Sequence, residues 1–216
     1  HHQDRLFYLT SRNTVRQVAI DAVQRLADRQ TEPLALRTLE LVSKDHACEH
    51  PDKACHGDDC PLAKGFFDRL PAARQEAADH QGTLTHQTLA KIAARHEICP
   101  YFLAQEMARW CDLVMADVNR MFDQSALLHA LVKQNDWKVS LLIDEAHNLV
   151  DRARAMYSVT LSQARLLRIR RQAPKPLKSA LSGVSRAWQS LLREALPDDG
   201  GEPVLLNNLP GALTNA

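Results

Sequence analysis

Short apolar runs alternate along the chain with longer segments in which apolar residues recur every three or four positions. The short runs, which predict strands, cover residues 6–9, 35–42, 113–116 and 139–143. The longer segments, which predict helices, cover residues 15–26, 62–70, 72–80, 85–96, 100–110 and 124–133. Strands that alternate with helices favour a parallel sheet, so the expected fold class is α/β.

Prolines and glycines divide the helical segments. Pro71 predicts that one helix ends at residue 70 and that a second begins on a new axis, whereas Pro100 suits the first position of a helix. Residues 46–60 show no periodicity and predict a loop that needs a ligand to become ordered. After Tyr157 the pattern changes to helices over residues 162–171 and 177–196, separated near Pro174.

Composition limits the possible classes of protein. The chain has 216 residues, of which 45% are hydrophobic, and this is enough to bury a real core. Its 27 basic and 26 acidic residues nearly cancel, so any nucleic-acid contact must come from local patches. We find no signal-peptide pattern and no apolar stretch of membrane-spanning length, and we therefore expect a cytoplasmic protein without a membrane partner.

Polar residues follow three of the predicted strands. Thr10, Ser11 and Arg12 follow the first, Asp117 and Asn119 follow the third, and Asp144-Glu145-Ala146-His147 follows the fourth. Ligands of parallel sheets bind at these carboxyl ends. An Asp-Glu pair directly after a buried strand is typical of the magnesium-binding acid of a nucleotide-hydrolysing motor.

The loop that would hold the nucleotide phosphates is missing from these 216 residues. None of the seven glycines is followed by lysine, so no segment matches Gly-x-x-x-x-Gly-Lys-Ser/Thr. We therefore expect a piece of a longer enzyme, with a phosphate-binding loop upstream and a second motor domain downstream, and no ATP hydrolysis by this piece alone.

Cysteines indicate a second site. In a chain without secretory features, Cys48, Cys55, Cys60 and Cys99 are better interpreted as metal ligands than as disulfides. Their gaps of six, four and 38 residues favour an iron-sulfur cluster, although four thiolates also suit zinc, which usually shows Cys-x-x-Cys pairs. The fifth cysteine, Cys111, is predicted to be an inert core thiol. The loop histidines 46, 50 and 56 are predicted to be solvated.

Several motifs together resemble one family. They are Phe7-Tyr8-Leu9-Thr10-Ser11-Arg12, the four-cysteine insertion, Trp110-Cys111-Asp112-Leu113-Val114-Met115-Ala116-Asp117-Val118-Asn119-Arg120-Met121-Phe122-Asp123 and Leu142-Ile143-Asp144-Glu145-Ala146-His147-Asn148-Leu149. Their order and spacing over about residues 5–160 are similar to those of iron-sulfur superfamily 2 DNA helicases, the XPD and DinG group, and closest to a bacterial XPD-like branch.

The resemblance implies a domain organisation. Part of a RecA-like motor domain would cover residues 1–42, a mainly helical iron-sulfur insertion residues 43–110, the remainder of the motor domain residues 111–157 and the start of a helical arch domain residues 158–216. Cys48, Cys55, Cys60 and Cys99 would hold a 4Fe-4S cluster.

The resemblance also implies roles at the nucleotide and DNA sites. Asp144 would coordinate the magnesium of ATP, Glu145 would orient or deprotonate the attacking water, and His147 would link the nucleotide site to DNA-contacting motifs. Residues that would contact DNA are Thr10, Ser11, Arg12, Asn119 and Arg120. The family usually has an aromatic residue near position 118 or 120, which this chain lacks.

The expected function is therefore a fragment of an ATP-dependent helicase that moves 5′ to 3′ on single-stranded or forked DNA, with the cluster domain aiding strand separation. The alternative is a non-catalytic, metal-stabilised DNA-binding or assembly module. The basic segment 165–178 fits either the solvated face of a helix or a groove for single-stranded DNA.

Overall fold

The computed structural model describes residues 3–31, 35–123, 126–195, 208 and 211. The chain divides into two compact units, His1–Tyr157 and Ser158–Ala216, and each is described by itself. The predicted start of one helix at Gln124 and the predicted end of another at Leu196 lie outside the described residues.

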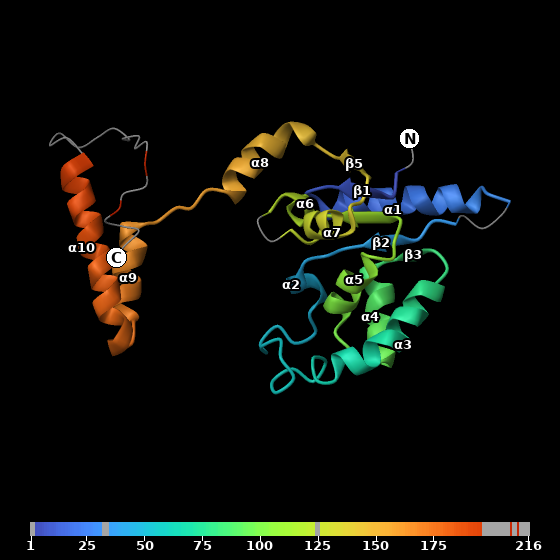
Figure 1. Cartoon of the computed structure of the whole chain (residues 1–216), viewed down its shortest axis with the longest axis horizontal. Helices are drawn as coiled ribbons and strands as arrows, with labels where there is room; N and C mark the ends of the chain where they lie inside the picture. Colours follow the sequence, from blue (N-terminus) through green and yellow to red (C-terminus); the bar gives the residue numbers. More distant parts are fainter. Residues whose placement is uncertain (1–2, 32–34, 124–125, 196–207, 209–210, 212–216) are drawn as a thin grey trace. The chain divides into compact units, whose positions relative to one another are not determined.

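The first unit is built on a five-stranded parallel sheet in the order β3-β2-β4-β1-β5 (Figure 1). Its strands are β1 (Arg5–Leu9), β2 (Thr38–Glu40), β3 (Thr83–Leu84), β4 (Leu113–Ala116) and β5 (Val139–Ile143). Leu9 pairs with Ala116 on one side and with Ile143 on the other, so three strands end level with one another. The α/β expectation is confirmed, while β3 was not predicted because two residues carry no periodicity.

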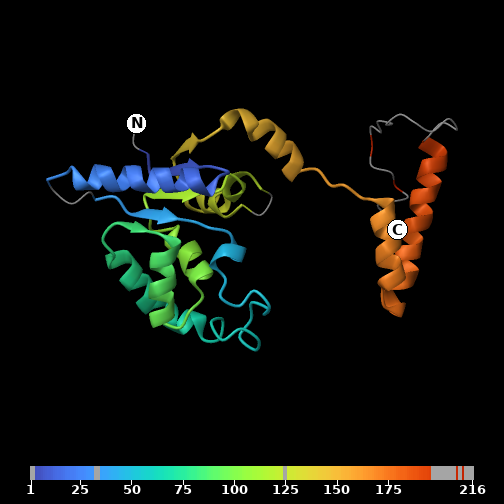
Figure 2. The same ribbon diagram turned by 180° about the vertical axis from the view of Figure 1, so that it is seen from behind.

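Helices cover both faces of the sheet. They are α1 (Asn13–Asp28), α2 (Lys44–Ala47), α3 (Phe66–Asp79), α4 (His86–Arg95), α5 (Pro100–Met107), α6 (Asn119–Phe122), α7 (Leu127–Asn135), the 3-10 turn η1 (Ala146–Asn148) and α8 (Leu149–Met156). Helix α1 packs on one face, and α3, α4 and α5 pack on the other, as Figure 1 and Figure 2 show from opposite sides. Leu128 and Leu131 of α7 belong to the same core as α3, α4 and α5.

Side chains alternate between the two faces along each strand, and this produces two apolar cores, one on each face of the sheet. In β1, Phe7 and Leu9 enter the core beneath the α3 to α5 helices, whereas Leu6 and Tyr8 face α1. Successive side chains of a strand point to opposite faces, and a parallel strand covered on both sides is apolar throughout. All four residues of β4 are buried for this reason.

Two predictions about the insertion helices are wrong. Helix α3 continues through Pro71, which lies in its second turn, where proline removes one intrahelical hydrogen bond. The buried residues Leu70, Ala73 and Ala77 hold the helix against the core despite that loss. Helix α5 begins at Pro100 as predicted but ends at Met107, so Trp110 leaves the helical face and is 42% exposed.

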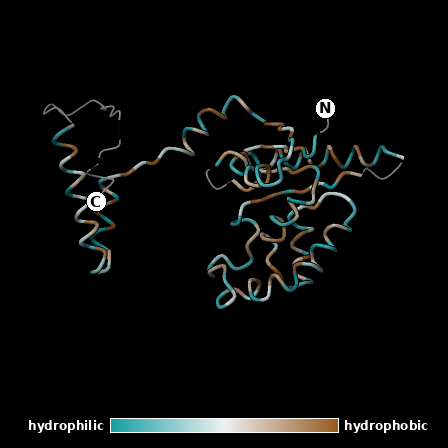
Figure 3. Tube along the Cα trace, viewed as in Figure 1, coloured by the Kyte–Doolittle hydropathy of each residue, from teal (hydrophilic) through white to brown (hydrophobic). Residues whose placement is uncertain are grey.

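The second unit is a helical hairpin of α9 (Gln163–Gln172) and α10 (Lys175–Ala195). The Ser162 side chain caps α9 by accepting from the Arg165 backbone N–H at 3.4 Å, and the break at Pro174 lies between the helices as predicted. Hydrophobic and hydrophilic residues alternate along both helices (Figure 3). Among the described helices, none is long and apolar enough to cross a membrane.

Candidate motor site and cysteine pocket

The carboxyl ends of β1 and β5 are joined by a side-chain hydrogen bond. The backbone N–H of Asp144 donates to the Leu9 carbonyl at 2.9 Å, which aligns the two chain ends. The Thr10 hydroxyl then donates to Asp144 Oδ2 at 3.2 Å. Thr10 is fully buried, so its hydroxyl positions the acid and does not face solvent.

Predicted site residues from the ends of β1 and β5 line one small cavity of about 10 Å³. Its lining includes Ser11 after β1, and Asp144 and Glu145 after β5. Glu145 has a positive φ of 53°, and its Oε2 lies 3.2 Å from Nδ1 of His147. Arg152 of α8 also lines the cavity. It was not predicted, because a basic residue on a helix beyond the motif carries no distinctive sequence signal.

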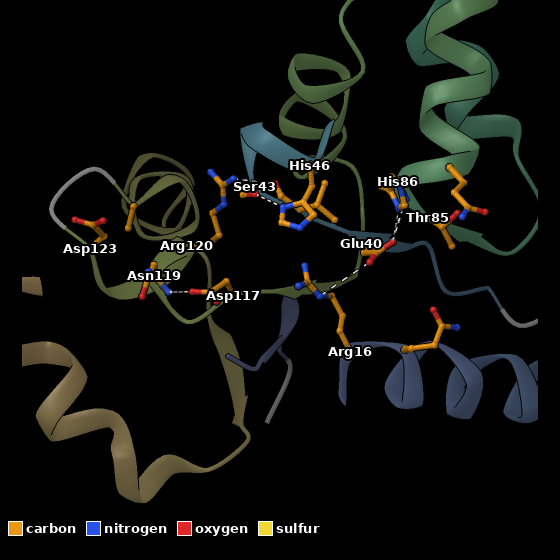
Figure 4. A pocket seen from close by; sticks show the side chains of 14 residues that line it. Arg16, Glu40, Ser43, His46, Thr85, His86, Asp117, Asn119, Arg120 and Asp123 are labelled. Carbon is orange, nitrogen blue, oxygen red and sulfur yellow. Dashed lines mark hydrogen bonds and ion pairs between the residues drawn. The ribbon is translucent and has the colours of Figure 1, made fainter. Parts of the chain in front are cut away.

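Asn119 and Arg120 lie instead at a larger cavity of about 700 Å³, shown in Figure 4. The Arg120 guanidinium donates to the Val42 carbonyl at 2.8 Å and to the Tyr101 hydroxyl at 3.3 Å, and it also lies over the Tyr101 ring. Arg120 thus joins the segment after β2 to α5. The Asn119 backbone N–H donates to the Asp117 carboxylate at 2.9 Å.

The opposite wall of this cavity carries a network that was not predicted. Arg16 is buried and donates from Nη1 to the Leu41 carbonyl at 2.6 Å, while its Nε lies 4.0 Å from Glu40 Oε1. The other Glu40 oxygen accepts from the His86 backbone N–H at 3.0 Å (Figure 4). Glu40 therefore connects α1 of the sheet unit to the start of α4. Acidic and basic side chains are both present in the lining and balance one another in charge, so the cavity has no excess of positive charge.

The four predicted cysteine ligands line one cavity of about 20 Å³. Cys48 and Cys99 are half-buried, Cys60 is buried and Cys55 is exposed. Among the described residues, no three histidine, cysteine or carboxylate side chains are gathered closely enough to hold a metal ion. The four thiols therefore line one cavity, but their positions do not form a complete metal-binding site.

The surroundings of this cavity act on the cysteines in opposite directions. Lys44 lies beside the cysteines, and a hydrogen bond with Cys55, followed by the charge of Cys55, raises the pKa of Lys44. Burial raises the pKa of Cys99, and backbone N–H groups of Phe102 and Tyr101 partly oppose that rise. An ammonium group and backbone donors that stabilise thiolates fit a cluster held by four cysteines.

Cys111 lies outside this cavity. It is fully buried next to β4, and burial raises its pKa to about 12. A thiol that stays protonated in an apolar core is a poor metal ligand and a poor nucleophile. The structure therefore places Cys111 in the core, as the sequence predicted.

The fold is thus an α/β domain with a parallel sheet, in which Asp144 follows one strand and helices α2 to α5 lie between β2 and β4 along the chain. The DEAD_2 family profile matches residues 10–166, and the chain belongs to this family of XPD, RTEL and FANCJ helicases. Members of the family are ATP-dependent helicases, and XPD-type members use a 4Fe-4S cluster and magnesium ATP.

Individual relatives agree with this assignment. The chain is 23% identical over 173 residues to the regulator of telomere elongation helicase 1 homolog of Anopheles gambiae, covering 74% of this chain and 17% of that protein. It is 28% identical over 142 residues to the Fanconi anemia group J protein homolog of Gallus gallus, covering 57% of this chain and 11% of that protein. The chain thus spans less than a fifth of these relatives.

A solved structure has the same fold. A structure titled "Truncated XPD" superposes with a TM-score of 0.55 at 16% identity, covering 99% of this chain and 61% of that one. At this identity the match supports the fold alone.

Proposed function

We propose that this chain is the part of an ATP-dependent DNA helicase that carries the magnesium-binding acid, the iron-sulfur insertion at residues 43–110 and the start of an arch domain at residues 158–216. The parent enzyme would move 5′ to 3′ on single-stranded or forked DNA. The observation that carries the proposal is the hydrogen bond between Thr10 and Asp144, because it joins the two predicted motifs at the carboxyl end of the sheet.

Within this proposal, the acids act on the nucleotide. Asp144 would bind the magnesium of ATP, and the buried Thr10 hydroxyl would hold its carboxylate in place before the metal arrives. Glu145 would orient or deprotonate water, and His147, 3.2 Å from it, would report the state of the site to the DNA-contacting segment. Because no phosphate-binding loop is present in these 216 residues, we expect no ATP turnover by this polypeptide alone.

Ser11 and Arg12 are the proposed phosphate contacts, because they follow the buried Thr10 at the exit of β1 and lie outside the core. The test is fluorescence anisotropy with a labelled single-stranded oligonucleotide. Arg12→Ala should weaken binding and reduce the slope of log K against log salt by about 0.7, the value for one phosphate contact on a single strand. Arg25→Ala, an exposed arginine at the far end of α1, is the matched control and should change the slope less.

The four cysteines are proposed to hold a 4Fe-4S cluster, which would supply a rigid crosslink for the loop between α2 and α3. Iron and sulfide analysis with absorbance spectroscopy tests this assignment. Cys48→Ser and Cys99→Ser should each lose iron, whereas Cys111→Ala should retain it. Stoichiometric zinc without iron in anaerobically prepared protein would contradict the assignment.

A further inference from the structure

One arginine that follows β4 contacts the insertion at two separate points. Arg120 of α6 is half-buried, and its guanidinium donates from Nη2 to the Val42 carbonyl at 2.8 Å and from Nη1 to the Tyr101 hydroxyl at 3.3 Å. The guanidinium carbon also lies 5.6 Å from the centre of the Tyr101 ring. Val42 lies where the chain enters the insertion, and Tyr101 lies in α5, the last helix before β4. A single side chain therefore joins the two arms of the insertion.

Each of these contact points is connected directly to a cysteine of the cavity. Val42 leads into α2, whose last turn ends with the Cys48 backbone N–H in a hydrogen bond of 2.8 Å. Tyr101 lies in the first turn of α5, which begins directly after Cys99, and its side chain lines the cysteine cavity. Arg120 therefore holds the segments that carry Cys48 and Cys99 next to each other.

The chemistry of arginine suits this double contact. A guanidinium is planar, carries donors on several nitrogens and can also lie over an aromatic face, whereas the lysine ammonium is a point charge that cannot reproduce this arrangement. Arg120 uses two of its nitrogens on Val42 and Tyr101, inside the protein. This engagement differs from the DNA contact that the sequence resemblance implies for Arg120.

The entering arm is held at successive carbonyls. The Leu41 carbonyl accepts from Nη1 of the buried Arg16 at 2.6 Å, and the next carbonyl, that of Val42, accepts from Arg120. Figure 4 shows the Arg120 side chain directed from α6 toward the segment that carries Ser43. Two arginines from different elements of the sheet unit thus hold the chain at the point where it leaves β2.

We propose that Arg120 is a positioning residue of the cysteine cavity. By binding Val42 and Tyr101 together, it sets the separation of Cys48 and Cys99 and ties both to the end of β4. The proposal rests on the function proposed above for the identity of the bound cluster, while the contacts of Arg120 belong to the polypeptide itself. It is therefore tested with one measurement that needs iron and one that does not.

The first measurement is the rate at which a chelator removes iron from anaerobically prepared protein. Arg120→Ala should lose iron about tenfold faster than the native protein, the lower end of the effect that loss of an outer partner has on a metal site. Arg120→Lys keeps a cation beside Tyr101 but cannot bind both partners, so its rate should lie between the two. Arg25→Ala, which removes an exposed arginine from the last turn of α1, is the matched control and should release iron at the native rate.

The second measurement is hydrogen exchange of the metal-free proteins by mass spectrometry. Peptides that cover residues 42–48 and 99–103 should exchange faster in Arg120→Ala than in the native protein, while the peptide of β1 should be unchanged. Tyr101→Phe removes the hydroxyl and should show a smaller increase. Because Arg120 acts partly through this hydroxyl, the double variant should show less than the sum of the two single effects.

A core variant separates positioning from general instability. Leu131→Ala removes a buried side chain of α7 that has no part in the Arg120 contacts and should lower the stability of the whole unit. It should release iron more slowly than Arg120→Ala. Equal rates in Leu131→Ala and Arg120→Ala would attribute the iron loss to instability and overturn the proposal.

Other results also decide the matter. Native iron release and native exchange in Arg120→Ala would refute the positioning role. Native exchange together with a salt slope of single-stranded DNA binding lowered by about 0.7 would make Arg120 a phosphate contact instead. If the native protein holds no iron but Arg120→Ala still exchanges faster at both arms, the cluster assignment fails while the positioning role stands.

Discussion

The edge of the sheet that carries Asp144 and the helical insertion that carries the cysteines are stabilised in different ways. Strand β5 is apolar except for Ser140, yet its other residues are only half-buried and Leu142 is 51% exposed, whereas every residue of β4 is buried. The insertion helices bury Leu103 and Met107 completely. Among the described strands β5 pairs with β1 alone, while the buried residues of α3, α4 and α5 share one core cluster with those of β1, β2 and β4.

This difference shows which region is stabilised by burial in the core. Helices α3, α4 and α5 pack against the sheet and contribute to its main apolar core. The acid-bearing edge depends on pairing with β1 and on the Thr10 hydrogen bond to Asp144. Changes in the two regions should therefore differ in size, and the following predictions test that contrast.

Removing a core side chain of the insertion should have the largest effect. Leu103→Ala deletes a fully buried side chain and should lower the free energy of unfolding by about 2–5 kcal/mol. Leu142→Ala removes a half-exposed leucine of β5 and should cost less than about 1 kcal/mol. Urea denaturation followed by circular dichroism measures both. Equal losses would show that β5 is as tightly packed as the insertion.

Removing the hydroxyl between the strands should have an intermediate effect. Thr10→Val keeps the shape of the side chain but takes a hydrogen bond from Asp144 and leaves the Arg12 backbone N–H without its acceptor, at a cost of about 1–3 kcal/mol. Thr14→Val, at an exposed position of α1, is the control. Iron content should be unchanged in Thr10→Val, and a variant that loses iron would contradict the independence of the two regions.

Replacing a surface carboxylate, Glu76, should have the smallest effect on the free energy of unfolding. The effect should be visible only as a change in its pH dependence. Hydrogen bonds from Arg95 and then from His96 hold the pKa of Glu76 below its ordinary value of 4.5. A folded pKa below the unfolded one means that the stabilisation is present above about pH 4.5 and is lost as pH falls further. In Glu76→Gln, the free energy of unfolding should therefore change less between pH 5 and 3 than in the native protein. Identical pH profiles would exclude this contribution.

Local sequence pattern was enough to predict most of the elements. The strands ending at Leu9, Ala116 and Ile143 and the polar residues after them were evident, because apolar runs and strand exits are local features. The continuation of α3 through Pro71 was missed, since burial of Ala73 and Ala77 is a tertiary effect that outweighs the local preference of proline. Strand β3 was too short to leave a pattern.

The site was only partly predictable for a similar reason. The sequence predicted Asp144 and the four cysteines as site residues, but it could not show that Thr10 is buried against Asp144 or that Arg120 is engaged with Val42 and Tyr101. Such pairings join residues far apart in the chain, and their geometry exists only after folding. The Glu40 network was missed because none of its members belongs to a motif.

Burial of Cys111 has a practical consequence for chemical labelling. A thiol that is inaccessible and protonated, with a pKa of about 12, will not react with alkylating reagents while the protein is folded. In protein without a bound cluster, alkylation would therefore report first on the exposed Cys55. Modification of Cys111 would in turn serve as a built-in signal that the sheet has opened.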